Sequence, residues 1–148
     1  LLAAGAETTA APLALPLRPF RGDLARPVLG EVTAPFGKLQ PTRFGTTIHR
    51  NGVEIAASEG QPVLAVHEGQ VAFASSFTGF GNLIILDHGG QSFSLYGYLS
   101  SLAVQRGTQV DRQTPLGTVG RAPAGPASLY FELRVDGQPV DPVEWLKD

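Results

Sequence analysis

The chain has 148 residues, a formal net charge of −2 at pH 7, 18 glycines, 12 prolines and no cysteine. A chain of this length forms one domain with a sizeable core, and the absence of cysteine excludes disulfides and thiol chemistry. The small negative charge provides no basic surface, so nucleic acid is not expected as a partner. No segment approaches the roughly 18 consecutive apolar residues that span a bilayer, so no membrane span is expected.

The first part of the chain lacks the rhythm of strands and turns. Residues 1–16 are rich in Ala, Leu, Thr and Pro, and Gly5 together with the prolines from Pro12 onward disfavours a long helix. Such a segment fits the end of an upstream helix or the remnant of an export signal. We therefore predict that residues 1–20 are a linker or tail that contributes little stability, and that residues 21–148 form the domain.

Short aliphatic segments separated by glycine-containing turns follow. The expected strands are residues 63–66, 70–74, 82–86 and 92–96, and the expected turns are residues 68–69, 79–81 and 89–90. High glycine and proline contents are typical of short strands that meet in tight turns. This pattern predicts a small β protein that is built from hairpins and has little helix.

The clearest strand is residues 127–135, because apolar and polar side chains alternate along it. The apolar positions are Leu129, Phe131, Leu133 and Val135, and the polar positions are Ser128, Tyr130, Glu132 and Arg134. A period of two is typical of a strand with one face in a core and the other face outside it. We expect the apolar set to be buried and the polar set to face a groove.

This strand resembles the last motif strand of the lysostaphin/LytM-type zinc endopeptidases, the M23 peptidases, which cut peptidoglycan cross-links. The family's H-x-H motif reads Ser-Leu-Tyr at residues 128–130, so both histidine positions are changed. The first motif, H-x-G-x-D, maps onto residues 50–54. Arg50 therefore stands where the family has a zinc-binding histidine, and Glu54 stands where it has an aspartate.

The family's middle motif, Tyr-Ala-His-Leu, reads Tyr-Gly-Tyr-Leu at residues 96–99, so Tyr98 replaces another catalytic histidine. The resemblance covers residues 28–146. It implies an all-β, mostly antiparallel LytM/M23 peptidase-like β sandwich of the duplicated-hybrid-motif type.

The changed motif positions predict that the chain is not an enzyme. A hydroxyl, a phenol and a guanidinium cannot replace neutral imidazoles as zinc ligands or proton carriers near neutral pH. We therefore expect no catalytic residue, no metal site and no cofactor. His49, His67 and His88 are interpreted as structural or solvated. The alternative is a bulge that turns His49 toward Glu54, which still lacks a third ligand.

Strand parity predicts which side chains lie in the core and which line the former active-site groove. The expected core includes Val53, Ile55, Leu83, Ile85, Phe93, Leu95, Leu99, Leu129, Phe131 and Leu133. The predicted partner-binding groove consists of Arg50, Glu54, Tyr96, Tyr98, Ser128, Tyr130 and Arg134, together with Asn51, which the family resemblance implies. Tyr and Arg are enriched at binding hot spots because each combines a large contact area with a polar group. The simpler alternative is that the tyrosines only fill a vacated metal pocket.

Four strings resemble the murein hydrolase activators, which are inactive members of this family. They lie at residues 57–60 (Ala-Ser-Glu-Gly), 94–98 (Ser-Leu-Tyr-Gly-Tyr), 128–132 (Ser-Leu-Tyr-Phe-Glu) and 142–146 (Pro-x-x-Trp-Leu). The resemblance implies a periplasmic, non-catalytic activator of N-acetylmuramoyl-L-alanine amidases in septal peptidoglycan splitting and daughter-cell separation. It also implies that an upstream coiled coil controls access to the groove, and that the amidase docks at Asn51, Glu54, Tyr96, Tyr130 and Arg134.

Two other functions remain open at this point. One is a peptidoglycan-binding or structural module of the cell envelope, which would use the groove that once held a peptide stem. The other is an enzyme with a rebuilt site, which the missing imidazoles disfavour. Upstream heptads with apolar a and d positions would favour the activator, whereas a sugar-binding repeat would favour the wall-binding module.

Overall fold

The computed structural model describes residues 15–41, 47–123 and 125–148, with the backbone alone for residues 38–41 and 47–49. The described chain is almost entirely β-structure, with a three-residue 3-10 helix near each end. Its elements are η1 (Arg18–Phe20), β2 (Val32–Ala34), β3 (Gly37–Pro41), β4 (Thr47–Arg50), β5 (Gly52–Ala56), β6 (Pro62–Leu64), β7 (Gly69–Phe77), β8 (Gly81–Gly89), β9 (Ser92–Leu102), β10 (Gln109–Val110), β11 (Pro115–Arg121), β12 (Ala127–Val135), β13 (Gln138–Val140) and η2 (Pro142–Glu144). Among the described residues, no helix has the length and apolar character that crossing a membrane requires.

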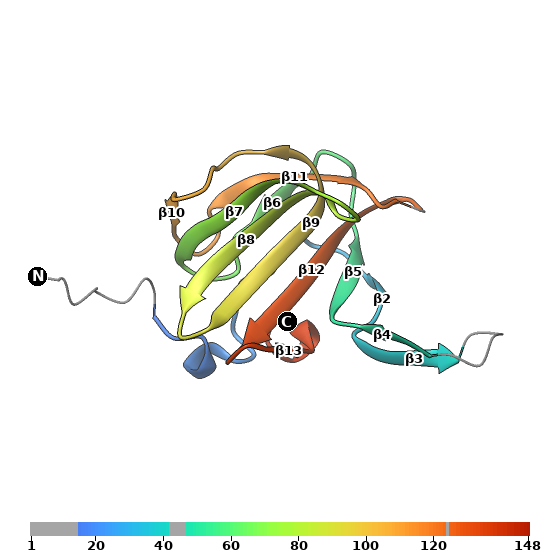
Figure 1. The fold of residues 1–148 in the computed structure, drawn as a ribbon, viewed down its shortest axis with the longest axis horizontal. Coiled ribbons are helices and arrows are strands. Elements are labelled where there is room, and N and C mark those ends of the chain that lie inside the picture. The colour runs from blue at the N-terminus through green and yellow to red at the C-terminus, as the bar shows by residue number, and fades with distance from the viewer. Residues whose placement is uncertain (1–14, 42–46, 124) are drawn as a thin grey trace, which may run out of the picture.

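Ten of the strands form one open sheet (Figure 1). Their order is β10-β7-β8-β9-β11-β12-β5-β2, with β6 paired to β11 and β13 paired to β12. β9 and β12 also pair directly, and all of these pairings are antiparallel. The predicted all-β, mostly antiparallel fold is thus confirmed. The strands that were expected to form a sandwich are hydrogen-bonded into one continuous sheet. β3 and β4 form a separate hairpin that projects from the body of the domain (Figure 1).

The turn predicted near residues 89–90 joins β8 to β9. Gly89 pairs with Ser92, so Gly90 and Gln91 are the two central residues of a tight hairpin. Their φ angles are +60° and +62°. Positive φ at both central positions matches the right-handed twist of the flanking strands, which explains why a glycine occupies the first of them.

Most of the residues that the alternation assigns to the core are buried. Val53, Ile55, Leu83, Leu99, Leu129, Phe131 and Leu133 are each at most 4% exposed. Ile85, Phe93 and Leu95 differ from the prediction, since all three are partly exposed, and Ile85 and Leu95 line a groove on the sheet.

A bulge in β9 explains the error at Leu95. Tyr98 has a φ of +64°, and the pairing of β9 with both β8 and β11 shifts register in this region. Tyr96 and Leu99 are therefore both buried although they are three residues apart. Counting back from Leu99 in steps of two assigns Leu95 to the core and Tyr96 to the groove, and the bulge reverses both assignments.

A chain of buried hydrogen bonds starts at Tyr96. Its hydroxyl accepts from the backbone N–H of Val66 at 3.1 Å and lies 2.8 Å from Oγ of Ser94. Oγ of Ser94 lies 2.7 Å from Nε2 of His88, whose Nδ1 lies 2.8 Å from the carbonyl oxygen of Glu68. Because a carbonyl only accepts, Nδ1 carries the proton and Nε2 accepts from Ser94. The chain of donors therefore has one direction and requires a neutral imidazole at position 88.

The burial of His88 makes stability depend on pH. Burial lowers the pKa of His88 from 6.5 to about 4, so the unfolded chain binds the proton first as the pH falls. The resulting stabilisation is complete above about pH 6.5 and is lost toward pH 4, on the order of 3 kcal/mol in total. Urea unfolding between pH 4 and 7 should show this loss in the unchanged chain and a smaller loss in His88→Gln. Equal pH dependence of the two proteins would contradict the assignment.

The packed chain begins before the predicted boundary at residue 21. Leu17 is 2% exposed and belongs to the hydrophobic core. The carbonyl oxygen of Leu15 lies 2.7 Å from Nε2 of His67, and the ring of Phe20 is centred 4.9 Å from that imidazole. Residues 15–20 therefore contact the domain, residues 1–14 lie outside the described part of the chain, and the small contribution of residues 1–20 to stability stays a prediction.

Backbone hydrogen bonds join the two ends of the domain. Leu24 forms a parallel bridge with Leu146. The N–H groups of Gly22 and Leu24 donate to the carbonyl oxygen of Trp145 at 3.0 and 3.1 Å, and the N–H of Lys147 donates to the carbonyl oxygen of Leu24 at 2.8 Å. Residues 22–24 and 145–147, here called the terminal strap, therefore run side by side.

Candidate functional site

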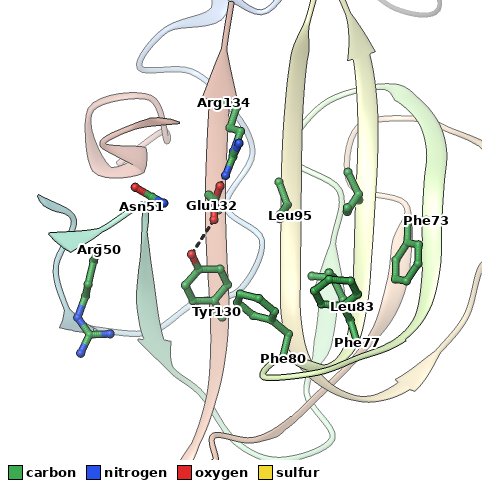
Figure 2. Close-up of a pocket in the computed structure, with 11 residues that line it drawn as sticks. Arg50, Asn51, Phe73, Phe77, Phe80, Leu83, Leu95, Tyr130, Glu132 and Arg134 are labelled. Carbon is green, nitrogen blue, oxygen red and sulfur yellow. Dashed lines mark hydrogen bonds and ion pairs between the residues drawn. The ribbon is translucent and has the colours of Figure 1, made fainter. Parts of the chain in front are cut away.

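A groove of about 500 Å³ lies on the face of the sheet that β7, β8, β9 and β12 form (Figure 2). One side of it is apolar and the other is polar. The apolar lining is Phe73, Phe77, Phe80, Leu83, Ile85 and Leu95, and the polar lining is Arg50, Asn51, Tyr130, Glu132 and Arg134. Such a combination of apolar floor and a few convergent polar groups is typical of binding sites.

Three side chains of β12 form the first polar cluster of the groove. The Nε–H of Arg134 donates to Oε2 of Glu132 at 2.5 Å, and the hydroxyl of Tyr130 donates to Oε1 at 2.7 Å. The carboxylate of Glu132 is almost fully buried, while the Arg134 side chain is 40% exposed. Burial, followed by the hydrogen bond to Glu132, raises the pKa of Tyr130 well above 10, so its phenol stays protonated. Glu132 thus fixes the position of an accessible guanidinium.

A second cluster of the same composition spans β4, β5 and β9. Nη1 of Arg50 lies 3.5 Å from Oε2 of Glu54, and the hydroxyl of Tyr98 donates to that oxygen at 3.0 Å. Burial, followed by the hydrogen bond to Glu54, raises the pKa of Tyr98 to about 12. The rings of Tyr98 and Tyr130 are centred 5.9 Å apart, so the two Arg–Glu–Tyr clusters are neighbours.

Gly52, the glycine of the first motif, allows the two clusters to approach. A Cβ at this position would lie 2.5 Å from the carbonyl oxygen of Phe131 and 2.9 Å from the ring and hydroxyl of Tyr130. Any larger residue would therefore push β5 away from β12 or displace Tyr130.

A second pocket, of about 350 Å³, adjoins the groove and shares Arg50 with it. Its lining is Thr33, Arg50, Glu54, Ala56, Tyr98, Ala122, Pro123, Gly125, Pro126, Ala127 and Ser128. Within the described part of the chain, Nε of Arg50 and Oγ of Ser128 are buried and have no hydrogen-bond partner.

The structure gathers seven of the eight predicted groove residues. Arg50, Asn51, Tyr130 and Arg134 line the groove, and Arg50, Glu54, Tyr98 and Ser128 line the adjoining pocket. Tyr96 was assigned wrongly, because it is fully buried and its ring is centred 5.3 Å from that of Phe131. The role of these seven residues in binding a partner stays a prediction.

The apolar floor of the groove was missed from the sequence. Its aromatic part is a row in which the rings of Phe73 and Phe77 are centred 5.9 Å apart, and those of Phe77 and Phe80 are 6.2 Å apart. Phe80 also contacts Tyr130, with ring centres 5.0 Å apart (Figure 2). The available signal was three phenylalanines within eight residues around a glycine turn, of which Phe77 is 51% exposed.

The residues at the motif positions do not fit the zinc ion of the LytM-type endopeptidases. The guanidinium of Arg50 has no lone pair, and the phenols of Tyr98 and Tyr130 are held protonated as donors to Glu54 and Glu132. Over the described ranges no three His, Asp or Glu residues come together as a metal site would need. The side chain of His49, the residue of the alternative site, lies outside the described residues.

Purified protein is expected to contain far less than one zinc per chain after dialysis against buffer free of metal. The physical reason is that Arg50 and Tyr130 replace two ligands of the zinc ion: the guanidinium repels a dication, and the phenol of Tyr130 is a hydrogen-bond donor. Elemental analysis by plasma mass spectrometry measures the content directly. Near-equimolar zinc that is lost in His49→Ala would overturn this reading and restore the enzyme hypothesis.

Curated relatives are similar over most of the domain. The chain is 39% identical over 130 residues to the murein hydrolase activator EnvC of Escherichia coli (strain K12), a match that covers 79% of this chain and 31% of EnvC. It is 35% identical over 125 residues to a lipoprotein NlpD/LppB homolog of Pseudomonas aeruginosa, covering 83% of this chain and 42% of that protein. The chain therefore spans about a third of the length of these relatives.

Solved structures share the fold. A zinc-containing peptidase from Vibrio cholerae superposes with a TM-score of 0.74 at 23% identity, over 84% of this chain and 39% of that chain. Residues 48–142, which include both Arg–Glu–Tyr clusters, match the family described as Peptidase family M23. With its sheet, its motif positions and this match in agreement, the chain belongs to peptidase family M23.

Proposed function

We propose that this protein is a non-catalytic activator of murein hydrolases, and specifically of periplasmic N-acetylmuramoyl-L-alanine amidases in septal peptidoglycan splitting and daughter-cell separation. The observation that carries the proposal is the replacement of the metal site by two hydrogen-bonded Arg–Glu–Tyr clusters beside an open apolar groove. The relatives that bear the name murein hydrolase activator support it.

The groove has the composition of a protein-docking surface. Its apolar floor presents Phe73, Phe77 and Phe80, and its polar side presents Tyr130 and Arg134. Aromatic and arginine side chains provide most of the binding energy at protein interfaces when they lie at the centre and the contacts around them exclude water. Because Glu132 holds the guanidinium of Arg134 in place, less side-chain entropy is lost when a partner binds.

The proposed docking set is therefore the groove together with its adjoining pocket. It consists of Arg50, Asn51, Glu54, Tyr98, Ser128, Tyr130 and Arg134, extended by the phenylalanine row. Peptidoglycan is a second proposed partner, as the polymer that the bound amidase acts on.

The test is a dye-release assay on labelled peptidoglycan with the 148-residue chain, a candidate amidase from the same organism, and both together. We expect no release by the chain alone and a several-fold rise in the release by the amidase when the chain is added. Release by the chain alone would support the enzyme instead. Sedimentation of the chain with peptidoglycan, without an effect on any amidase of the organism, would support the wall-binding module.

A further inference from the structure

Two residues that line the pocket beside the groove, Arg50 and Ser128, each have a buried polar atom without a partner among the described residues. These atoms are Nε of Arg50 and Oγ of Ser128, and the pocket has a volume of about 350 Å³. A buried donor without an acceptor is unfavourable, and two of them on residues of one pocket wall favour a ligand there that accepts hydrogen bonds.

The geometry of Arg50 defines the chemistry of that ligand. Its Nη1 faces Glu54 at 3.5 Å, which leaves the opposite edge of the guanidinium, formed by Nε and Nη2, directed elsewhere. This edge carries two parallel N–H groups, the arrangement that a carboxylate takes in a bidentate contact. The hydroxyl of Ser128 can donate a third hydrogen bond, whereas a neutral amide would satisfy only part of this set.

The remaining lining limits the size of the ligand. Apart from Arg50, Glu54 and Tyr98, the pocket is walled by small side chains. These are Thr33, Ala56, Ala122, Pro123, Gly125, Pro126, Ala127 and Ser128. A short unbranched acidic side chain fits such walls, because its methylenes contact alanine and proline while its carboxylate reaches Arg50.

We propose that the pocket binds the carboxylate of an aspartate or glutamate side chain on the docking partner, while the groove binds that partner's apolar side chains. The inference rests on the proposed docking function and adds the chemistry that the partner must carry. Arg50 belongs to both the groove and the pocket, so the acidic residue lies next to the apolar ones along the partner segment. A cation at this position thus takes over the attraction for oxygen ligands that a metal ion has in zinc-containing relatives.

The negative charge of Glu54 repels a carboxylate in this pocket. Removing that charge therefore tests whether Arg50 binds a ligand or only pairs with Glu54. Glu54 is 23% exposed and shares Arg50 with the incoming carboxylate. Glu54→Gln removes one negative charge and keeps an oxygen that can accept from Tyr98. The variant should therefore bind a carboxylate several-fold more tightly, a gain that a merely structural Arg50–Glu54 pair would not produce.

The direct experiment uses N-acetyl-L-glutamate as probe and N-acetyl-L-glutamine as its neutral isostere. In ¹⁵N-labelled protein, the glutamate is expected to shift the Nε–H signal of Arg50 and the amide signal of Ser128, and the glutamine is not. Arg50→Gln, read at the amide of Ser128, and Ser128→Ala, read at the Nε–H of Arg50, should each weaken binding of the glutamate about tenfold or more, as loss of a charge-assisted contact requires. Arg18→Gln, which changes an exposed arginine paired with Asp136, is the matched control and should respond like the unchanged chain.

Equal shifts with both probes, or full shifts in Arg50→Gln and Ser128→Ala, would mean an adventitious ion only and would overturn the proposal. An amidase activation assay separates this failure from failure of the docking function. Loss of activation in Phe80→Ala but not in Arg50→Gln or Ser128→Ala would contradict carboxylate binding in the pocket and would support the groove as the docking site. Full activation by all three folded variants would contradict both proposals.

Discussion

Arg134→Ala is expected to reduce binding and activation of a cognate amidase by tenfold or more. The guanidinium is 40% exposed at the groove and is anchored by the buried Glu132, so it is presented to a partner in a fixed position. Truncating an arginine of this kind at an interface costs about 2 kcal/mol or more, mostly through faster dissociation. Surface plasmon resonance with the amidase and the dye-release assay measure the two effects.

The same change should also lower the free energy of unfolding. The carboxylate of Glu132 is buried, and Arg134→Ala leaves it with Tyr130 as its remaining hydrogen-bond donor among the described residues. We expect a loss of about 1–3 kcal/mol in urea unfolding. Adding Glu132→Gln, which removes the unpaired charge, should restore part of the stability but none of the binding.

Arg121→Ala is the matched control for this prediction. Arg121 is 76% exposed and pairs with Glu59 at 3.2 Å, so its loss should change stability by less than about 1 kcal/mol and leave activation intact. If Arg134→Ala activates the amidase as well as this control does, the groove is not the docking site.

Phe131→Ala is expected to produce the largest loss of stability, about 3–5 kcal/mol. The ring is fully buried, contacts Tyr96, and belongs to β12, which is paired on both sides by β5 and β9. Strands held on both sides cannot collapse into the space that the ring leaves, so a cavity remains. Urea unfolding at pH 7 measures the loss.

Phe77→Ala provides the comparison, because it removes the same atoms from a side chain that is 51% exposed. We expect this variant to lose about 1 kcal/mol or less, since most of the ring surface already contacts water. A loss at Phe131 no larger than that at Phe77 would contradict the position of Phe131 in the core.

The fold could be predicted from the sequence where the pattern is regular. In β12 the alternation of Leu129, Phe131 and Leu133 with polar residues is unbroken, and the strand and its buried face were both predicted correctly. In β9 the alternation is interrupted at Tyr98, whose positive φ leaves no trace in a list of residue types. Counting residues in steps of two past Tyr98 assigns Tyr96 to the wrong face, because one inserted residue exchanges the two sides of a strand.

The polar half of the site could be predicted and the apolar half could not. Changed motif positions mark Arg50 and Tyr130 directly, because the family expects histidines there. The phenylalanine row and Leu95 come from β7, the turn between β7 and β8, and β9, and their common surface exists only once β7, β8 and β9 are paired. The packing of Leu17 was missed for a similar reason, since one apolar residue in a proline-rich segment has no period to reveal it.

The terminal strap determines how the domain bears mechanical load. Tension on the chain before residue 22 is first resisted by the burial of Leu17 and then by the backbone bonds of Gly22 and Leu24 to Trp145. These bonds lie between parallel segments, so a pull along the segments loads them together rather than one after another. A domain tethered on this side would pass the force into its C-terminal segment, and the groove would keep its shape until the strap sheared.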